Sequence, residues 1–274
     1  DKIIDLNACY LQTKQTPEIL NWFRDFCLTE KLEPYNSNTA DGYLRFLVIR
    51  ESTYTGEIMI NLITKTKETE LIEKLGEKLK EKFPNITSFY NSVYAKLGQV
   101  ATAEELILVF GNPVISDSIL GLKFEISPFS FFQPNTKAAE IVYQKLIEMA
   151  NFKGNETVLD LYCGVGSISL AIANKVKKVF GFELIEEAVK AAERNRQINN
   201  IDNAEFFAGD LKDVVKVHPA FANNNIDMII VDPPRGGLHP NVIEKILELK
   251  IPIILYVSCN PVSQADNLQA LCQS

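Results

Sequence analysis

The sequence predicts an α/β protein in which a parallel sheet covered by helices follows a smaller α+β domain. The chain has 274 residues, 46% of them hydrophobic, which is enough to build two buried cores. After Pro128, apolar strands and amphipathic helices alternate strictly, as they do in a parallel sheet with helices on both faces. Before Pro128, short strands and helices follow one another in no repeating order. We therefore expect an α+β central domain at residues 1–127 and an α/β domain at 128–274.

Hydrophobic spacing predicts two helices in the first domain, at 18–27 and 68–83. The second helix ends before Pro84, and its Lys and Glu residues recur three and four positions apart, as on a solvated helix face. Segments in which apolar and polar residues alternate and β-branched residues are frequent predict the strands of this domain, at 43–50, 56–64, 88–94, 106–110 and 122–126.

The second domain is predicted to be a series of strands and helices. Its strands are expected at 157–162, 178–183, 204–208, 227–231 and 251–257, and its helices at 135–152, 167–174, 186–199 and 240–249. In an open parallel sheet, ligands bind beyond the carboxyl ends of the strands, at the point where the strand order reverses. The unusual short motifs of this half all lie at such strand ends.

Three motifs together predict an adenosine site. Asp160 to Gly166 follows the first strand, and its glycines, Gly164 and Gly166, allow a tight turn that a ligand can approach closely. Glu183 ends the second strand 17 residues after Gly166, where a carboxylate can accept hydrogen bonds from both ribose hydroxyls. Asp210 follows the third strand and is placed to meet the adenine amino group. The other interpretation of these acids is helix N-capping.

The details of the glycine turn narrow the choice of cofactor. Ser169 stands where the dinucleotide fingerprint has its third glycine. No lysine accompanies the turn to grip a phosphate. The expected cofactor is therefore S-adenosylmethionine rather than ATP or NAD.

The ends of the fourth and fifth strands carry the motifs expected to perform the chemistry. Asp232 is followed by two prolines and Arg235, a rigid segment whose carbonyl groups are free for a ligand because proline donates no hydrogen bond. Cys259 ends the fifth strand beside the expected cofactor site, where its thiolate would be a nucleophile. A buried, inert cysteine is the alternative for Cys259 and the expected role of Cys163, which lies behind the glycine turn.

These motifs resemble those of the 5-methyluridine RNA methyltransferases of tRNA and ribosomal RNA. The resemblance extends from about Cys9 to the last residue, and residues 44–57 are similar to the central domain of the ribosomal-RNA branch. It implies a class I, Rossmann-like methyltransferase sheet that binds S-adenosylmethionine. The residues that carry it are Phe131 to Asn135, Asp160 to Gly166, Asp232 to Gly236 and Ser258 to Pro261.

The resemblance also implies roles for single residues. Gln133, Tyr162, Glu183 and Asp232 match family positions around the cofactor and the target base, and Cys259 matches the nucleophile. The implied reaction begins when the thiolate adds to carbon 6 of a uracil that is flipped out of its stack. Carbon 5 then takes the methyl group, and a base removes the carbon-5 proton to release the enzyme.

Two family features lie outside this sequence. The resemblance places the proton-abstracting glutamate and two closing strands after Ser274, and an RNA-gripping barrel before Asp1, so the chain is expected to be an internal piece of a longer enzyme. Cys9 resembles the fourth cluster ligand of the iron-sulfur members of the family. The alternative interpretation is that Cys9 is a surface cysteine that binds no metal. A cluster is therefore expected only in a longer chain. No metal site is expected here, since the five cysteines and two histidines form no complete zinc pattern.

The net charge of −7 bears on the expected partners. Residues 1–127 hold 14 Lys and Arg against 18 Asp and Glu, and the remainder holds 14 against 17, so neither half is basic. The expected substrate is RNA, with 23S ribosomal RNA favoured over tRNA, held weakly and with strong salt dependence by this chain alone. No stretch reaches the roughly 18 apolar residues of a membrane span, and the first residues form no secretory signal. We therefore expect a cytoplasmic monomer with no membrane partner.

Two alternatives remain open on the sequence. Methyltransferases that act on cytosine carbon 5 also use a cysteine, but commonly in a Pro-Cys context after the fourth strand, where this chain has Asp232 and two prolines. A non-catalytic RNA-binding or scaffold module would keep the fold and the cofactor pocket, and the acidic charge favours it. Transfer of labelled methyl groups to a uracil-containing RNA, with and without Cys259, separates the second alternative from catalysis.

Overall fold

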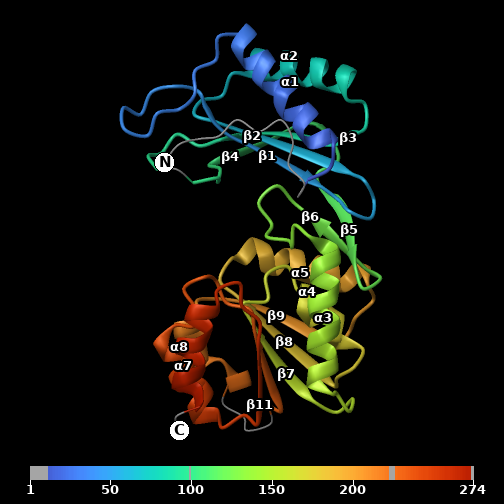
Figure 1. Cartoon of the computed structure of the whole chain (residues 1–274), viewed down its shortest axis with the longest axis vertical. Coiled ribbons are helices and arrows are strands. Elements are labelled where there is room, and N and C mark those ends of the chain that lie inside the picture. The colour runs from blue at the N-terminus through green and yellow to red at the C-terminus, as the bar shows by residue number, and fades with distance from the viewer. Residues whose placement is uncertain (1–11, 99, 222–225, 273–274) are drawn as a thin grey trace. The chain divides into compact units, whose positions relative to one another are not determined.

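The chain packs as two compact units in the computed structural model, which describes residues 12–98, 100–221 and 226–272 (Figure 1). Residues 116–126, which a boundary at 127/128 would place with the first half, group with the second. Unit 1 comprises Asp1–Ser52, Gly56–Ile115 and Ser127–Phe129, and unit 2 comprises Thr53–Thr55, Ser116–Ile126 and Ser130–Ser274.

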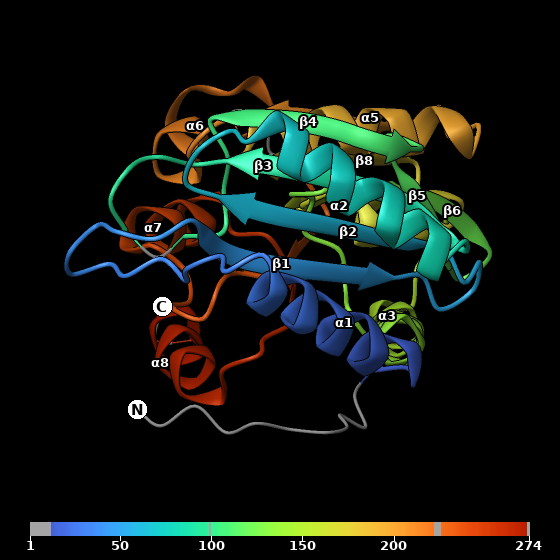
Figure 2. The same ribbon diagram turned by 90° about the horizontal axis from the view of Figure 1, so that it is seen from above.

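Unit 1 is a four-stranded sheet with two helices on one face (Figure 2). Its elements are α1 (Gln15–Thr29), β1 (Leu44–Glu51), β2 (Ile58–Thr64), α2 (Thr69–Lys82), β3 (Ile86–Val93) and β4 (Glu105–Gly111). In the strand order β1-β2-β3-β4, the central pair β2 and β3 is parallel and the outer pairs are antiparallel. Phe23 of α1, Leu75 of α2 and Phe89 of β3 pack together in the core between helices and sheet.

The elements of unit 1 agree with the predictions made for residues 18–110. Each predicted helix and strand is present, with ends shifted by no more than three residues. Helix α2 shows why the periodicity was informative, because Ile72, Leu75 and Leu79 recur at three- and four-residue spacing and are all buried.

Unit 2 contains the parallel sheet that the second half of the sequence predicted. A hairpin of β5 (Ile115–Ile119) and β6 (Leu122–Ile126) precedes it. The sheet consists of β7 (Thr157–Leu161), β8 (Lys178–Glu183), β9 (Ala204–Ala208), β10 (Met228–Val231) and β11 (Ile253–Tyr256). All neighbouring strands are parallel, and the order β11-β10-β7-β8-β9 reverses between β7 and β10.

Helices cover both faces of this sheet (Figure 1). They are α3 (Thr136–Ala150), α4 (Ser167–Ala173), α5 (Glu186–Ile198), α6 (Leu211–Val217), α7 (Pro240–Leu249) and α8 (Pro261–Cys272), with a 3-10 turn at Pro219–Phe221. On the α6 and α7 face, Leu161 and Val231 are buried in one cluster with Val215 and Ile246. Helices α4 and α5 pack on the other face. In the described part of the chain, no helix is long and apolar enough to cross a membrane.

Helix α5 holds strand β6 with two asparagine side chains. Asn195 is fully buried; its Oδ1 accepts a hydrogen bond from the Glu125 N–H at 2.8 Å, and its Nδ2 donates to the Val165 carbonyl at 3.2 Å. Asn199 accepts from the Lys123 N–H at 2.9 Å and donates to the Lys123 carbonyl at 2.7 Å. Both amides reach the same strand because residues four apart lie on one face of a helix. Asn195 thereby joins the hairpin to the glycine turn.

Replacing Asn195 with alanine should lower the free energy of unfolding by about 2 to 4 kcal/mol, because the part-buried Glu125 N–H and the buried Val165 carbonyl lose their hydrogen-bond partner. Urea unfolding measures this loss. Gln197→Ala is the matched control, since Gln197 is exposed on the same helix and surface changes of this kind cost less than about 0.5 kcal/mol. Equal losses in the two variants would show that the Asn195 bonds contribute nothing specific.

Candidate functional site

The candidate site lies at the carboxyl ends of the strands, where the order of the sheet reverses between β7 and β10. Leu161 of β7 is in register with Phe182 of β8 and with Val231 of β10. The residues that follow these three along the chain therefore form one row across the sheet edge. This row consists of Tyr162, Glu183 and Asp232, three of the residues predicted to bind the cofactor or the target base.

The glycine turn leaves β7 with an unusual backbone. Tyr162 has φ +69°, a left-handed conformation that is rare for a bulky side chain and typical of functional turns. Gly164 and Gly166 also have positive φ, at +56° and +82°. A Cβ at Gly164 would meet no atom within 4 Å, whereas one at Gly166 would lie 2.8 Å from the Phe206 ring. Gly164 therefore faces open space that a ligand can enter, and Gly166 is required by packing.

Glu183 anchors this turn. Its Oε2 accepts a hydrogen bond from the Gly164 N–H at 3.1 Å, and its Oε1 accepts one from the Ile185 N–H at 3.0 Å. A carboxylate has about four lone-pair sites, so both oxygens can accept further hydrogen bonds. The ribose contact of Glu183 remains a prediction.

Asp210 caps helix α6. Its Oδ1 accepts from the Lys212 N–H at 3.1 Å, and its Oδ2 lies 2.8 Å from the Lys212 ammonium. The hydrogen bond from Lys212 lowers the pKa of Asp210. The capping role considered for the strand-end acids is thus observed at Asp210, and its contact with adenine remains a prediction.

Asp160 is the most buried acid of the site. The Ser169 hydroxyl donates to its Oδ2 at 2.5 Å, whereas its Oδ1 has no hydrogen-bond partner among the described residues. Burial raises the pKa of Asp160 to about 7; the bond from Ser169 opposes this rise and the charge of Asp232 adds to it. Burial also raises the pKa of Asp232 to about 6. Two carboxyl groups in this state create an environment that favours a cationic ligand group.

Tyr143 lies beside the candidate site, a position that the sequence did not reveal. Its hydroxyl lies 2.8 Å from the Ser167 Oγ and is hydrogen-bonded to the Gln133 side chain. Burial raises the pKa of Tyr143 to about 12, so the phenol remains neutral. The charges of Asp160 and Asp232 also act on the Tyr143 hydroxyl and raise its pKa. Tyr143 occupies an apolar position of α3, so only its contacts distinguish it from a core residue.

The two cysteines near the site have opposite environments. Cys259 is exposed, in the turn between β11 and α8. Cys163 is buried beneath the glycine turn, and burial raises the pKa of its thiol well above the ordinary value. A Cβ at Gly181 would lie 3.0 Å from the Cys163 sulfur. Cys163 is therefore an unreactive packing residue, as expected, and Cys259 is the accessible thiol.

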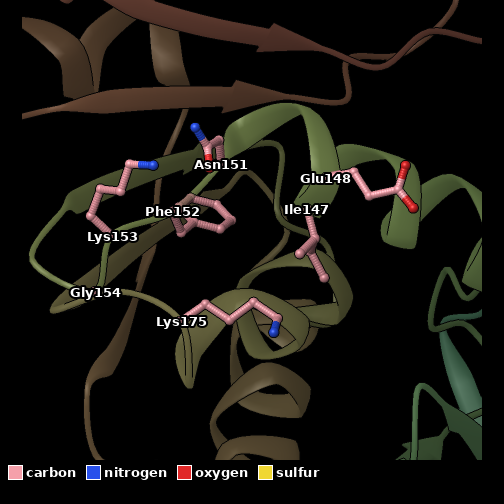
Figure 3. Close-up of a pocket in the computed structure, with 7 residues that line it drawn as sticks. All are labelled: Ile147, Glu148, Asn151, Phe152, Lys153, Gly154 and Lys175. Atoms are coloured by element: carbon pink, nitrogen blue, oxygen red, sulfur yellow. The ribbon is translucent and has the colours of Figure 1, made fainter.

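A separate hollow of about 460 Å³ opens on unit 2 near the carboxyl end of α3 (Figure 3). It contains no predicted site residue and lies before the amino end of β7, the opposite end of that strand from the glycine turn. It therefore does not define the candidate site. The lining residues are Ile147, Glu148, Asn151, Phe152, Lys153, Gly154 and Lys175.

The one predicted metal ligand cannot be placed. Cys9 lies outside the described residues. Within residues 12–98, 100–221 and 226–272, no group of three or more His, Cys, Asp or Glu side chains could hold a metal ion.

The sheet order, glycine turn and strand-end acids define the α/β methyltransferase fold. The sequence model of the family described as tRNA (uracil-5-)-methyltransferase matches residues 45–274. The chain belongs to this family.

Relatives and solved structures agree with this assignment. The chain is 38% identical over 273 residues to an Enterococcus faecalis protein described as an uncharacterized RNA methyltransferase, covering 99% of this chain and 59% of that protein. It is 38% identical over 272 residues to a Chlorobaculum tepidum protein of the same description, covering 98% and 55%. The chain thus spans a little more than half the length of these curated relatives.

A solved structure matches both units of the chain. It is the Pyrococcus abyssi tRNA (uracil-54, C5)-methyltransferase in complex with S-adenosyl-L-homocysteine. The TM-score is 0.79 at 31% sequence identity, and the match covers 99% of this chain and 64% of that one.

The buried acids predict a definite pH dependence of stability. Because the pKa of Asp160 rises from 3.8 to about 7 on folding, the folded protein binds more protons than the unfolded one between these values. This contribution is complete below the unfolded pKa and is lost as the pH rises through the folded pKa. The urea midpoint should therefore fall as the pH rises from about 4 to about 7.

Asp160→Asn should make that dependence weaker over the same range, because the amide does not titrate. Asp202→Asn is the control, since it makes the same chemical change at an exposed position. Parallel pH profiles for wild type and Asp160→Asn would contradict the role of Asp160.

Proposed function

We propose that this chain is the catalytic part of an RNA methyltransferase that uses S-adenosylmethionine to methylate carbon 5 of uracil. The observation that carries the proposal is the row of Tyr162, Glu183 and Asp232 at the strand ends, on the sheet whose last strand leads to the exposed Cys259. Membership of the uracil-5-methyltransferase family supports the reaction type. The Pyrococcus abyssi enzyme, crystallised with S-adenosyl-L-homocysteine, supports the cofactor.

The chemistry of the strand-end groups fits S-adenosylmethionine. Gly164 faces open space, and Glu183 keeps lone pairs for the ribose hydroxyls. The buried carboxyl of Asp160, which has one oxygen without a partner among the described residues, and the half-buried carboxyl of Asp232 suit the positive charges of this ligand. When bound, the cofactor supplies an electrophilic methyl group. The residues proposed to hold it are Gln133, Tyr162, Gly164, Glu183, Asp210 and Asp232.

In the proposed reaction, Cys259 solves the problem that carbon 5 of uracil is a poor nucleophile. The thiolate forms a bond to carbon 6, and the electron pair of the 5,6 double bond moves toward the carbon-4 carbonyl. Carbon 5 can then take the methyl group of S-adenosylmethionine, whose bond to the sulfonium sulfur breaks, so that S-adenosylhomocysteine leaves with the electron pair. A general base takes the carbon-5 proton, which restores the 5,6 double bond as the bond between carbon 6 and the Cys259 sulfur breaks and returns the thiolate.

The choice of target RNA rests on fewer observations than the reaction type does. The similarity of residues 44–57 to the ribosomal-RNA branch favours 23S ribosomal RNA, whereas the solved relative acts on uracil 54 of tRNA. Mapping 5-methyluridine in RNA hydrolysates from cells with and without the full-length gene decides between the two. A site lost from 23S RNA supports our choice, and one lost only from tRNA refutes it.

RNA that carries 5-fluorouracil at the target should trap Cys259 in a covalent adduct, because fluorine cannot leave carbon 5 as a proton does. Cys259→Ser should abolish the adduct, since an oxygen nucleophile cannot replace the thiolate. Cys163→Ser is the matched control and should retain it. Denaturing gels and peptide mass mapping measure both. An adduct that maps to another cysteine in Cys259→Ser would rule out the assignment of Cys259, whereas a wild-type protein that forms no adduct would favour a scaffold role.

Replacing Glu183 with alanine should weaken S-adenosyl-L-homocysteine binding by about 1.5 to 3 kcal/mol, the scale of hydrogen bonds to a charged group. The loss has two sources, the ribose contact and the anchoring of the Gly164 N–H. Calorimetry measures the affinity. Glu186→Ala should have no effect, since Glu186 is exposed on α5 and pairs with Lys190. Unchanged affinity in Glu183→Ala would remove Glu183 from the site.

A further inference from the structure

The turn that carries Cys259 is linked by an asparagine side chain to the segment that follows Asp232. We call residues 257–260 the cysteine turn and residues 232–237 the proline segment. The Asn260 Nδ2 donates to the Arg235 carbonyl in the proline segment at 2.9 Å. Cys259 precedes Asn260 directly, so this bond acts one residue away from the proposed nucleophile.

All the polar groups of Asn260 are engaged, so the residue cannot turn freely. Its Oδ1 accepts from the Val262 N–H at 3.1 Å, in the first turn of α8, and its own N–H donates to the Ser258 Oγ at 3.0 Å. Its carbonyl accepts from the Ser258 and Ser263 hydroxyls. These partners also fix the orientation of the amide, because Val262 requires an acceptor and the Arg235 carbonyl requires a donor.

A second asparagine of α8 provides a comparison. The Asn267 Oδ1 accepts from the Leu238 N–H at 2.7 Å and from the Tyr256 hydroxyl at 2.8 Å. Asn267 therefore also connects β11 to the residue that follows the proline segment. It does so through its amide oxygen, whereas Asn260 uses its amide nitrogen. A carboxylate at position 267 would keep both acceptor roles. At position 260 it would keep the bond from Val262 and lose the one to Arg235.

We propose that Asn260 is a positioning residue, which sets the place of Cys259 relative to Asp232 by tying the cysteine turn to the proline segment. Strand pairing brings the two segments together as far as the Val257 N–H, which donates to the Val231 carbonyl at 2.9 Å. Beyond that point the cysteine turn and the proline segment leave the sheet, and the hydrogen bond from the Asn260 amide to the Arg235 carbonyl connects them. The inference rests on the proposed role of Cys259 as the nucleophile.

The test compares Asn260→Asp with Asn267→Asp in the full-length protein. Both variants make the same chemical change, one directly before α8 and one within it, and only the first removes a bond between the cysteine turn and the proline segment. The rate constant of adduct formation is measured with 5-fluorouracil RNA at saturating RNA and S-adenosylmethionine. The dissociation constants of RNA and S-adenosyl-L-homocysteine are measured in parallel. Asn260→Ala, which adds no charge, is included as a second variant, and thermal melting confirms that each variant is folded.

Asn260→Asp and Asn260→Ala should slow adduct formation roughly ten- to a hundred-fold relative to Asn267→Asp, the cost of a misplaced reacting group. Both dissociation constants should stay within about twofold of the control, since the amide is not proposed to touch either ligand. A general loss of structure would instead weaken binding and rate together. Equal adduct rates in the variants at positions 260 and 267, or a loss confined to binding, overturn the inference. A wild-type protein that forms no adduct refutes the proposed function, and the inference falls with it.

Discussion

The site depends on the register of three parallel strands. Leu161, Phe182 and Val231 lie side by side and are all at most 1% exposed, so the hydrophobic core fixes how β7, β8 and β10 are aligned. A slip of one residue in β8 would turn Glu183 away from the glycine turn and move Phe182 out of its core cluster to the opposite face of the sheet. The same packing that stabilises unit 2 thus brings polar groups from distant parts of the sequence to one edge.

The ionised carboxyl groups of Asp160 and Asp232 at this edge of the sheet do not stabilise the fold. An ionised carboxyl group that is buried without a cation destabilises the folded state. Asp160 is fully buried, and one of its oxygens has no hydrogen-bond partner among the described residues. The charge of the half-buried Asp232 further disfavours the ionised form of Asp160. A positively charged ligand relieves this cost by stabilising the ionised forms. The arrangement is therefore better explained by ligand binding than by stability of the free protein.

The sequence predicted the elements whose signal is local and periodic. The parallel sheet followed from apolar strands alternating with amphipathic helices. Three elements, β5, α6 and α8, were missed. In β5, Asp117 stands between Ile115 and Ile119, and it is buried because it accepts hydrogen bonds from the N–H groups of residues 53 and 54, far away in the chain. Helix α6 is short, and α8 carries polar residues on most sides and buries only Leu271.

The positions of several residues at the candidate site could also be predicted from the sequence. Motifs at strand ends predicted that Glu183, Asp232 and Cys259 lie at one edge of the sheet, since the carboxyl ends of parallel strands share that edge. Tyr143 escaped notice because its contacts with Ser167 and Gln133 depend on how α3 packs, and its spacing is that of a core residue.

The asparagine side chains that bind β6 also affect whether this hairpin can pair with a strand of another molecule. A two-stranded hairpin such as β5 and β6 normally offers its outer backbone groups as a template for a strand from another molecule. Here Asn195 and Asn199 occupy the N–H groups of Glu125 and Lys123 and the carbonyl of Lys123. The helix thus imitates the missing neighbour strand. It closes the hairpin edge against intermolecular β-pairing and so protects the protein from aggregation at this point.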